Sequence, residues 1–248
     1  MTDRPVAIVT AAGSGIGAAC ARELAARNYD LVLMSRGDGA PQLAEELGGR
    51  AIQGSVLETA DLERLVETAM SAYGRIDGVV NNTGHAPHST AVIGREHDPD
   101  GETNLLDIPD DDWHLTLDLY FLNVVRMARF VTEPMRAQGG GAIVNISAFA
   151  AVEPHGSIPT SSTIRAALTG FTKLFADRYG ADNIRMNDVL PGFLDNYTWS
   201  ESLIGSIPMA RSGGVAEVAT TGAFLLSADA GYVTGQSIVV DGGMNRSV

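Results

Sequence analysis

The chain has 248 residues, 45% of them hydrophobic, which is typical of a protein with one substantial folded core. Its formal net charge of −13 disfavours nucleic acid and anionic membrane surfaces as partners, because binding phosphate groups needs a basic surface. We therefore expect no nucleic-acid partner and no membrane partner, and expect the charge to serve solubility.

The sequence also indicates a compartment. No apolar run approaches the roughly 18 residues that a membrane-spanning helix needs. The opening residues, MTDRPVAIVT, carry an acid and enter an apolar run at once, which does not resemble a signal peptide. Cys20 is the only cysteine, so it cannot form an internal disulfide, and its helix-like neighbours predict a buried thiol. These features favour the reducing cytoplasm.

Short apolar runs that predict strands alternate along the chain with segments of helical periodicity, such as Leu62, Leu65, Val66 and Ala69. This alternation predicts an α/β fold with a doubly wound, seven-stranded parallel sheet and helices on both faces. No linker-like stretch divides the chain, so we expect one domain over residues 1–248. The expected strands are Val6–Thr10, Asp30–Ser35, Ala51–Gly54, Gly78–Asn81, Gly141–Ser147, Ile184–Leu190 and Ser237–Val240.

The first strand runs into a glycine-rich turn, TAAGSGIGAACAREL. Gly13, Gly15 and Gly17 lie where a backbone must approach a pyrophosphate and where a helix N-terminus can face its charge. A tight turn between strand and helix, without any ligand, is the alternative interpretation.

The second strand ends in Ser35 and Arg36. An acid at this point would bind a ribose 2′-hydroxyl and repel a 2′-phosphate, whereas a small hydroxyl followed by a guanidinium does the opposite. The pair favours NADP(H) over NAD(H) as cofactor. An arginine that is merely solvated at the end of a strand is the alternative.

Five motifs resemble those of the short-chain dehydrogenases/reductases. TAAGSGIG is similar to the family's TGxxxGIG turn, with Ala11 in place of the first glycine, and NNTG is similar to NNAG. IVNIS resembles the strand that delivers the catalytic serine, LPGFLDN resembles the PGxxxT segment with Asn196 in place of threonine, and GYVTGQSIVVDGG resembles the closing strand. The resemblance covers nearly the whole chain and implies a Rossmann-like fold and oxidoreductase activity.

The resemblance also implies which residues contact the dinucleotide. They lie on the glycine turn, at the carboxyl ends of the following strands and on the PGxxxT-like segment. The cofactor-binding residues expected in this way are Thr10, Gly13, Ser14, Gly15, Ile16, Gly17, Ser35, Arg36, Ser55, Val56, Asn82, Thr83, Gly84, Arg165, Pro191, Gly192 and Leu194.

The catalytic positions depart from the family's Asn, Ser, Tyr and Lys. Alignment on the motifs places Tyr120, Ser147, Ser161 and Arg165 there, so only the serine is kept. A register shifted by one residue would offer Thr160 and Ile164 and leave no cation. Ser161 and Arg165 are four residues apart and share one helix face, which makes their register the better one chemically.

Each replacement changes the chemistry. A serine hydroxyl is a far poorer acid than a phenol, and arginine stays charged, so neither Ser161 nor Arg165 passes on a proton near neutral pH. The four hydroxyl residues Thr160–Thr163 have a second interpretation, because serine and threonine often cap helix N-termini. We expect capping to account for most of these hydroxyls and Arg165 to keep a cofactor role.

Tyr120 offers two opposite interpretations. As a relocated proton donor it would act beside Ser147, with Arg165 nearby favouring its phenolate and with Ser147 and Ser161 holding the substrate oxygen. As a space-filling side chain it would only occupy the volume of the missing tyrosine and block the pocket.

Residues 85–108 form an insertion relative to the family, at the mouth of the substrate cleft. His85, His88 and His97 lie in it among several acids, but their spacing matches no metal-ligand template, so we expect no metal and a solvated acidic segment instead. We expect this segment to shape the substrate site as a lid and to disfavour a large anionic substrate.

Three functions remain open on this sequence. The first is an NADP(H)-dependent oxidoreductase acting on a small carbonyl or alcohol substrate through an atypical active site. The second is a catalytically silent dinucleotide-binding protein, and the third is an enzyme of this fold with non-redox chemistry. The resemblance, together with two long apolar-faced helices expected at Asp110–Ala137 and Ser157–Tyr179, predicts a homotetramer or dimer.

Overall fold

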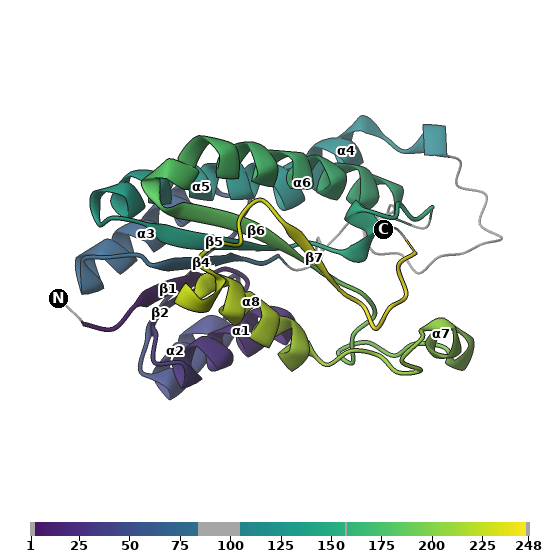
Figure 1. Ribbon diagram of the computed structural model, residues 1–248, viewed down its shortest axis with the longest axis horizontal. Helices are drawn as coiled ribbons and strands as arrows, with labels where there is room; N and C mark the ends of the chain where they lie inside the picture. The colour runs from purple at the N-terminus through teal and green to yellow at the C-terminus, as the bar shows by residue number, and fades with distance from the viewer. Residues whose placement is uncertain (1–2, 84–104, 157, 247–248) are drawn as a thin grey trace.

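A parallel sheet forms the centre of the molecule in the computed structural model, which describes residues 3–83, 105–156 and 158–246 (Figure 1). Within these residues seven strands pair in the order β3-β2-β1-β4-β5-β6-β7. The predicted parallel sheet is confirmed, and each strand lies within one residue of its predicted ends. The strands are β1 (Val6–Val9), β2 (Asp30–Ser35), β3 (Arg50–Gln53), β4 (Gly78–Asn81), β5 (Gly141–Ile146), β6 (Ile184–Pro191) and β7 (Ser237–Val240).

Helices cover both faces of the sheet, as predicted (Figure 1). One face carries α1 (Gly15–Ala26), α2 (Gly39–Leu47) and α8 (Val215–Leu226). The other carries α3 (Thr59–Tyr73), α5 (Asn123–Ala137) and α6 (Pro159–Tyr179). The shorter α4 (Asp110–Leu117) leads into α5, and α7 (Glu201–Ser206) follows β6.

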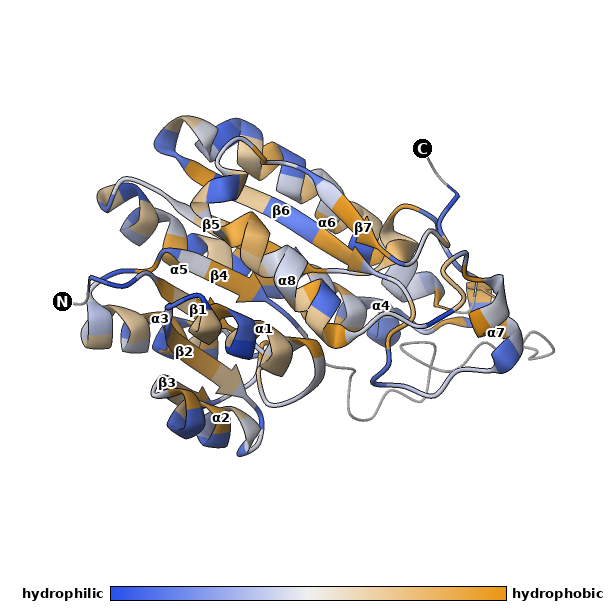
Figure 2. Cartoon of the chain, turned by 60° about the horizontal axis from the view of Figure 1, so that its bottom comes forward, coloured by the Kyte–Doolittle hydropathy of each residue, from blue (hydrophilic) through white to orange (hydrophobic). Residues whose placement is uncertain are grey.

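The strands read as continuous apolar runs because both of their faces are buried. In β1, Val6 and Ile8 pack into the cluster beneath α3 and α5, while Ala7 and Val9 pack into the cluster beneath α1 and α8. All four side chains are fully buried. Figure 2 shows the same apolar character along β1, β2 and β4, with a hydrophilic stretch inside β6.

The strand order places a crevice at the carboxyl ends of β1 and β4. The chain moves outward from β1 to β2 and β3, and then returns to β4 on the other side of β1, so the loops after β1 and β4 diverge. The Thr10 hydroxyl joins the two strand ends, donating to the Asn82 carbonyl oxygen at 2.7 Å and accepting from the Asn82 N–H at 2.9 Å. This crevice is where ligands bind in open parallel sheets.

The helix expected over Asp110–Ala137 is continuous but contains a π-helical turn, η2 (Asp118–Leu122), between α4 and α5. A π turn shifts the hydrogen-bond pattern by one residue and leaves a main-chain carbonyl without its usual donor. The Asn123 side chain donates to the Leu119 carbonyl oxygen at this point. The π turn therefore rotates the side chain of Tyr120, in its middle, relative to a regular helix.

A buried carboxyl group lies within the hydrophilic stretch of β6, the strand next to the edge strand β7. Asp188 accepts hydrogen bonds from Asn145 Nδ2 at 2.9 Å, Thr172 Oγ1 at 2.7 Å and Ser237 Oγ at 3.2 Å. Its burial raises the pKa of the Asp188 carboxyl to about 6, against the lowering effect of these three donors. The described contacts supply no cation to pair with it.

Cys20 is buried, as predicted, and burial raises the pKa of its thiol to about 12, so the thiol is inert. In the part of the chain that the structure describes, no helix is long and apolar enough to cross a membrane. The expected lid over residues 85–108 lies almost entirely outside the described residues, together with His85, His88 and His97. The extent of the domain, residues 1–248, stays a prediction.

Candidate active site

A cleft of about 1360 Å³ opens at the carboxyl edge of the sheet. Its walls come from the turn after β1, the ends of β2, β4, β5 and β6, and the segments that follow them. Of the predicted cofactor residues, the cleft is lined by Gly13, Ser14, Gly15, Ile16, Ser35, Arg36, Ser55, Val56, Asn82, Thr83, Arg165, Pro191, Gly192 and Leu194. The structure thus brings most of the predicted set together.

Three predicted residues are not part of the cleft wall. Thr10 lies behind it and joins β1 to β4 through the hydrogen bonds described above. Gly17 lies on the buried side of α1, so its contribution is packing and not contact with a ligand. Gly84 lies outside the described residues.

The glycine turn is shaped by main-chain contacts that leave no room for a side chain. A Cβ on Gly17 would lie 2.3 Å from the Ala11 carbonyl oxygen, and a Cβ on Gly39 would lie 2.6 Å from the Gly13 carbonyl oxygen. Gly15 has a φ of +53°, and Ala11, where the family has glycine, has a φ of +48°. The turn therefore directs the N-terminus of α1 at the cleft, which suits an anionic pyrophosphate.

The two predicted residues at the end of β2, Ser35 and Arg36, have different roles. Ser35 Oγ accepts from the Ala40 N–H at 2.9 Å and donates to the Gly37 carbonyl oxygen at 2.7 Å, so it holds the start of α2. Arg36 is exposed at the cleft. Asp38, the nearest acid on this loop, accepts a hydrogen bond from Gln53. The guanidinium of Arg36 is thus the charged group that this end of the cleft presents.

Ser147 lies directly after β5 with its hydroxyl at the cleft. Its N–H donates to the Val189 carbonyl oxygen at 2.8 Å, which fixes the main chain against β6. Its Oγ is buried and has no hydrogen-bond partner among the described residues. A buried hydroxyl of this kind is a ready donor for a substrate oxygen.

Arg165 is held from three sides. Its Nε donates to Ser161 Oγ at 3.1 Å, its Nη1 donates to the Ile146 carbonyl oxygen at 3.4 Å, and its guanidinium carbon lies 3.9 Å from the centre of the Tyr120 ring. Burial lowers the pKa of Arg165, while the neighbouring Tyr120 opposes that shift. The guanidinium nevertheless stays charged near neutral pH, because its ordinary pKa exceeds 12.

The four predicted catalytic residues therefore occupy two layers. Ser147 and Arg165 line the cleft, whereas Ser161 and Tyr120 lie behind Arg165 and do not line it. Tyr120 is only 5% exposed and packs with Leu119 and Ile164.

The expectation that the hydroxyls of Thr160–Thr163 cap α6 is wrong. The helix begins at Pro159, its N-cap is Ile158, and no side chain caps it. Proline at the first helical position already lacks the N–H that a cap would satisfy. Ser162 Oγ instead accepts from the His155 N–H at 3.1 Å, and Thr163 Oγ1 donates to the Pro159 carbonyl oxygen at 2.9 Å.

Sequence reasoning missed a row of aromatic side chains on the cleft wall. Phe149, Phe193, Tyr197, Trp199 and His155 all line the cleft. The signal was present in the sequence, since Phe149 follows Ser147 by two residues and Phe193 follows Pro191 by two.

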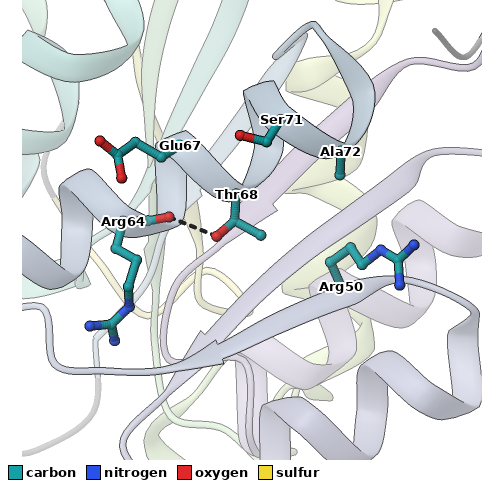
Figure 3. A pocket seen from close by; sticks show the side chains of 6 residues that line it. All are labelled: Arg50, Arg64, Glu67, Thr68, Ser71 and Ala72. Atoms are coloured by element: carbon teal, nitrogen blue, oxygen red, sulfur yellow. Dashed lines mark hydrogen bonds between the residues drawn. The ribbon is translucent and has the colours of Figure 1, made fainter.

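A second, smaller hollow of about 460 Å³ lies between β3 and α3, lined by Arg50, Arg64, Glu67, Thr68, Ser71 and Ala72 (Figure 3). Arg50 begins β3, whereas the cleft receives Gly54 and Ser55 from beyond the other end of that strand. The hollow therefore opens away from the cleft, and five of its six lining residues are exposed. The described residues also include no cluster of His, Cys, Asp and Glu that could hold a metal ion.

A doubly wound parallel sheet, a glycine turn at its switch point and a cleft beside that turn define a dinucleotide-binding protein of the Rossmann type. Comparison with known proteins narrows this class. The family described as enoyl-(acyl carrier protein) reductase matches residues 10–245.

Individual relatives and solved structures show the same similarity to reductases. Dehydrogenase/reductase SDR family member 4 of Oryctolagus cuniculus is 32% identical over 253 residues, covering 96% of this chain and 92% of that protein. L-sorbose reductase of Gluconobacter frateurii, solved with NADPH and L-sorbose, is 29% identical with a TM-score of 0.85 and covers 99% of this chain and 98% of that one. YwfH, an NADPH-dependent reductase involved in bacilysin biosynthesis, is 26% identical with a TM-score of 0.87 over 99% of this chain and 100% of that one.

The chain belongs to the short-chain dehydrogenase/reductase family. It is an enzyme of the oxidoreductase class.

Proposed function

We propose that the protein is an NADP(H)-dependent oxidoreductase that interconverts a small carbonyl compound and its alcohol through an atypical active site. The observation that carries this proposal is the pairing of Ser147 and Arg165 at the cleft, with Ser147 Oγ buried and without a partner among the described residues. The relatives that were solved with NADPH or that depend on it support the cofactor.

Different residues of the cleft have different roles in this reaction. NADPH, when bound, supplies a hydride to the carbonyl carbon of the substrate. The N-terminus of α1 holds the pyrophosphate, and Pro191 and Gly192 border the nicotinamide end. Ser147 Oγ donates a hydrogen bond to the carbonyl oxygen, and the fixed charge of Arg165 stabilises the negative charge that develops there.

The preference for NADP(H) over NAD(H) is proposed from Arg36, whose guanidinium suits the 2′-phosphate. Arg36→Asp should weaken NADPH binding about 10- to 100-fold and should reverse the preference, because it replaces an attraction with a repulsion. Isothermal titration calorimetry with both cofactors measures this. Arg50→Asp, at the hollow of Figure 3, is the matched control and should leave both affinities unchanged. Tighter NADH binding in the unaltered protein would contradict the proposal.

The source of the proton is proposed to be the Tyr120 hydroxyl, adjacent to Arg165. Tyr120→Phe should then abolish turnover and leave NADPH affinity unchanged. Turnover that survives this change would contradict the relocated acid.

A catalytically silent dinucleotide-binding protein is the second candidate, and the burial of Tyr120 behind Arg165 favours it. Stopped-flow measurement of NADPH oxidation over a panel of aldehydes and ketones separates the two candidates. Tight NADPH binding without oxidation on any member of the panel would favour the silent protein.

We also propose a homodimer or homotetramer in the cytoplasm. Leu174 on α6 is 69% exposed, Phe224 on α8 is 41% exposed and Val239 on the edge strand β7 is 36% exposed, so apolar side chains are available to a second copy. The single buried cysteine supports the compartment. A monomeric mass by light scattering at micromolar concentration would contradict the assembly.

A further inference from the structure

The aromatic residues of the cleft begin next to the reacting centre. Phe149 and Phe193 each stand two residues beyond a residue that borders the proposed nicotinamide end, Ser147 and Pro191 respectively. Their ring centres are 5.5 Å apart although the two residues come from different loops. The two loops therefore meet at the place where a substrate carbonyl would bind.

From this point the rings continue outward in contact with one another. Trp199 lies 4.7 Å from Phe193, Tyr197 lies 5.7 Å from Trp199, and His155 lies 6.4 Å from Phe149, all between ring centres. We name this row of five rings the aromatic wall. It is a continuous lining and not a set of isolated side chains.

The rings of the aromatic wall are held in place and lie outside the buried core. The Trp199 Nε1 donates to the Leu194 carbonyl oxygen at 2.7 Å, which fixes the orientation of the indole. Phe149, Phe193 and Trp199 are half-buried, and Tyr197 is 49% exposed, so ring surface remains open to the cleft. Fixed rings lose little conformational freedom when a ligand binds.

The charges of the cleft restrict what this wall accepts. None of the described residues that line the cleft is an aspartate or a glutamate, so a cationic substrate finds no counter-charge there. The aromatic wall itself contains no arginine or lysine, and the guanidinium of Arg165 serves the carbonyl oxygen, so a negative charge on the part of the substrate that lies against the wall would have no arginine or lysine of the wall to pair with. Arg36, the other guanidinium that lines the cleft, lies at the opposite end, which is the proposed adenosine end. An uncharged substrate fits best.

Building on the proposed function, we infer that the substrate is an uncharged aryl ketone or aryl aldehyde, with its ring against the aromatic wall and its carbonyl at Ser147. The ring is placed close to the carbonyl because Phe149 follows Ser147 by only two residues and both line the cleft. Reduction transfers a hydride from NADPH to the carbonyl carbon, the C=O π bond breaks, and the oxygen takes a proton from the proposed donor, the Tyr120 hydroxyl, which solvent then reprotonates. The products are the benzylic alcohol and NADP⁺.

The test compares acetophenone with cyclohexyl methyl ketone, which have the same carbon skeleton and carbonyl but differ in the flat π system. Calorimetry on the protein with saturating NADP⁺ measures their affinities without turnover. We expect acetophenone to bind about tenfold more tightly, about 1.4 kcal/mol, because aromatic pairs gain more than area burial alone. Equal affinities, or tighter binding of the cyclohexyl ketone, would overturn the inference.

Substitutions in the aromatic wall test whether its rings cause the preference for acetophenone. Trp199→Leu and Phe149→Leu should each lower the acetophenone preference toward unity while NADP⁺ affinity stays unchanged, and an unaltered preference in both would contradict the role of the wall. Tyr232→Leu, at a fully exposed tyrosine that does not line the cleft, should change neither affinity.

The proposed function has its own readout, the oxidation of NADPH. Preferential acetophenone binding without oxidation of NADPH by any carbonyl compound would contradict the proposed activity and support the ring-binding site. Oxidation of NADPH with both ketones at equal kcat/KM would support the activity and overturn the inferred substrate class.

Discussion

The two ends of the cleft are built in different ways. The cofactor end depends on main-chain geometry, with Gly17 and Gly39 placed where a Cβ would collide with a carbonyl oxygen. The catalytic end depends on side chains carried by helices, and the sequence motifs predict that Tyr120, Ser161 and Arg165 stand where the family has other residues. A site made by the main chain tolerates few sequences, whereas side chains on a fixed helix can be exchanged without changing the fold.

Tyr120, Ser161 and Arg165 nevertheless pack together as one unit. The ring of Tyr120 lies against the guanidinium of Arg165, and Arg165 donates to the hydroxyl of Ser161. Tyr120 and Ser161 therefore share Arg165 as a neighbour. Tyr120 itself lies within the π turn at Asp118–Leu122.

The strongest test of this comparison is to rebuild the family's catalytic set. The triple variant Tyr120→Asn, Ser161→Tyr, Arg165→Lys gives these three positions the asparagine, tyrosine and lysine of the family's usual set. We expect kcat for NADPH-dependent carbonyl reduction to rise about 10²- to 10⁴-fold, which is the usual contribution of a positioned acid. Steady-state NADPH oxidation on a panel of aldehydes and ketones measures it.

Arg165→Lys alone is the control for that variant. It breaks the bond to Ser161 Oγ and the stacking on Tyr120 without supplying an acid, so turnover should not rise. A triple variant that folds, binds NADPH and turns over no faster than the unaltered protein would show that the catalytic end is limited by more than these three residues.

The next largest effect is expected at the cofactor end. Gly17→Ala places a methyl group 2.3 Å from the Ala11 carbonyl oxygen and 2.7 Å from Asn82 Nδ2, so α1 must move away from the turn. We expect roughly 1–3 kcal/mol lower stability and at least tenfold weaker NADPH binding, measured by urea denaturation and calorimetry. Gly170→Ala in α6 has no atom within 4 Å and should leave both unchanged or gain up to about 1 kcal/mol in stability.

The sequence predicts the cofactor end better than the catalytic end, because the cofactor end depends on local sequence patterns. Strands buried on both faces appear as continuous apolar runs, and a main-chain turn needs glycine at fixed spacing, so both are visible as local patterns. The aromatic wall is not local, because Phe149 and Phe193 meet only when two loops converge. The orientation of Tyr120 depends on a one-residue shift of hydrogen bonds in η2, and no residue type signals that shift.

The buried Asp188 offers a test of stability near the catalytic end. It pairs with Asn145, two residues before Ser147, and lies three residues before Pro191 on β6. Its folded pKa of about 6 lies above the unfolded value of about 3.9, so folding favours the neutral carboxyl. Its stabilising contribution is complete below about pH 3.9 and is lost as the pH rises through 6. The loss amounts to about 3 kcal/mol.

Asp188→Asn removes this ionisation and keeps a hydrogen-bonding group beside Asn145, Thr172 and Ser237. The stability of the variant relative to the unaltered protein should therefore rise by about 3 kcal/mol between pH 3 and pH 8, measured by urea denaturation at each pH. Asp229→Asn, at an exposed acid, provides the comparison and should show no such trend. A pH-independent difference for Asp188→Asn would mean that the carboxyl is already ionised at acidic pH.

The smallest effect is expected at Ala11, where the glycine turn departs from the family's motif. Its φ of +48° is a left-handed conformation that costs an alanine about 1–2 kcal/mol and costs a glycine almost nothing. Ala11→Gly relieves that strain but adds about 0.4–1 kcal/mol of unfolded-state entropy, so we expect a net gain in stability of at most about 1 kcal/mol. NADPH affinity should stay unchanged, because the turn already has the shape that glycine prefers.

The neighbouring Ala12→Gly is the control, at a fully buried alanine without positive φ. It adds the same unfolded-state entropy and removes a buried methyl group, so the protein should lose roughly 1–2 kcal/mol of stability. If Ala11→Gly destabilises the protein as much as Ala12→Gly does, position 11 is not strained, and the replacement of the family's glycine carries no structural cost.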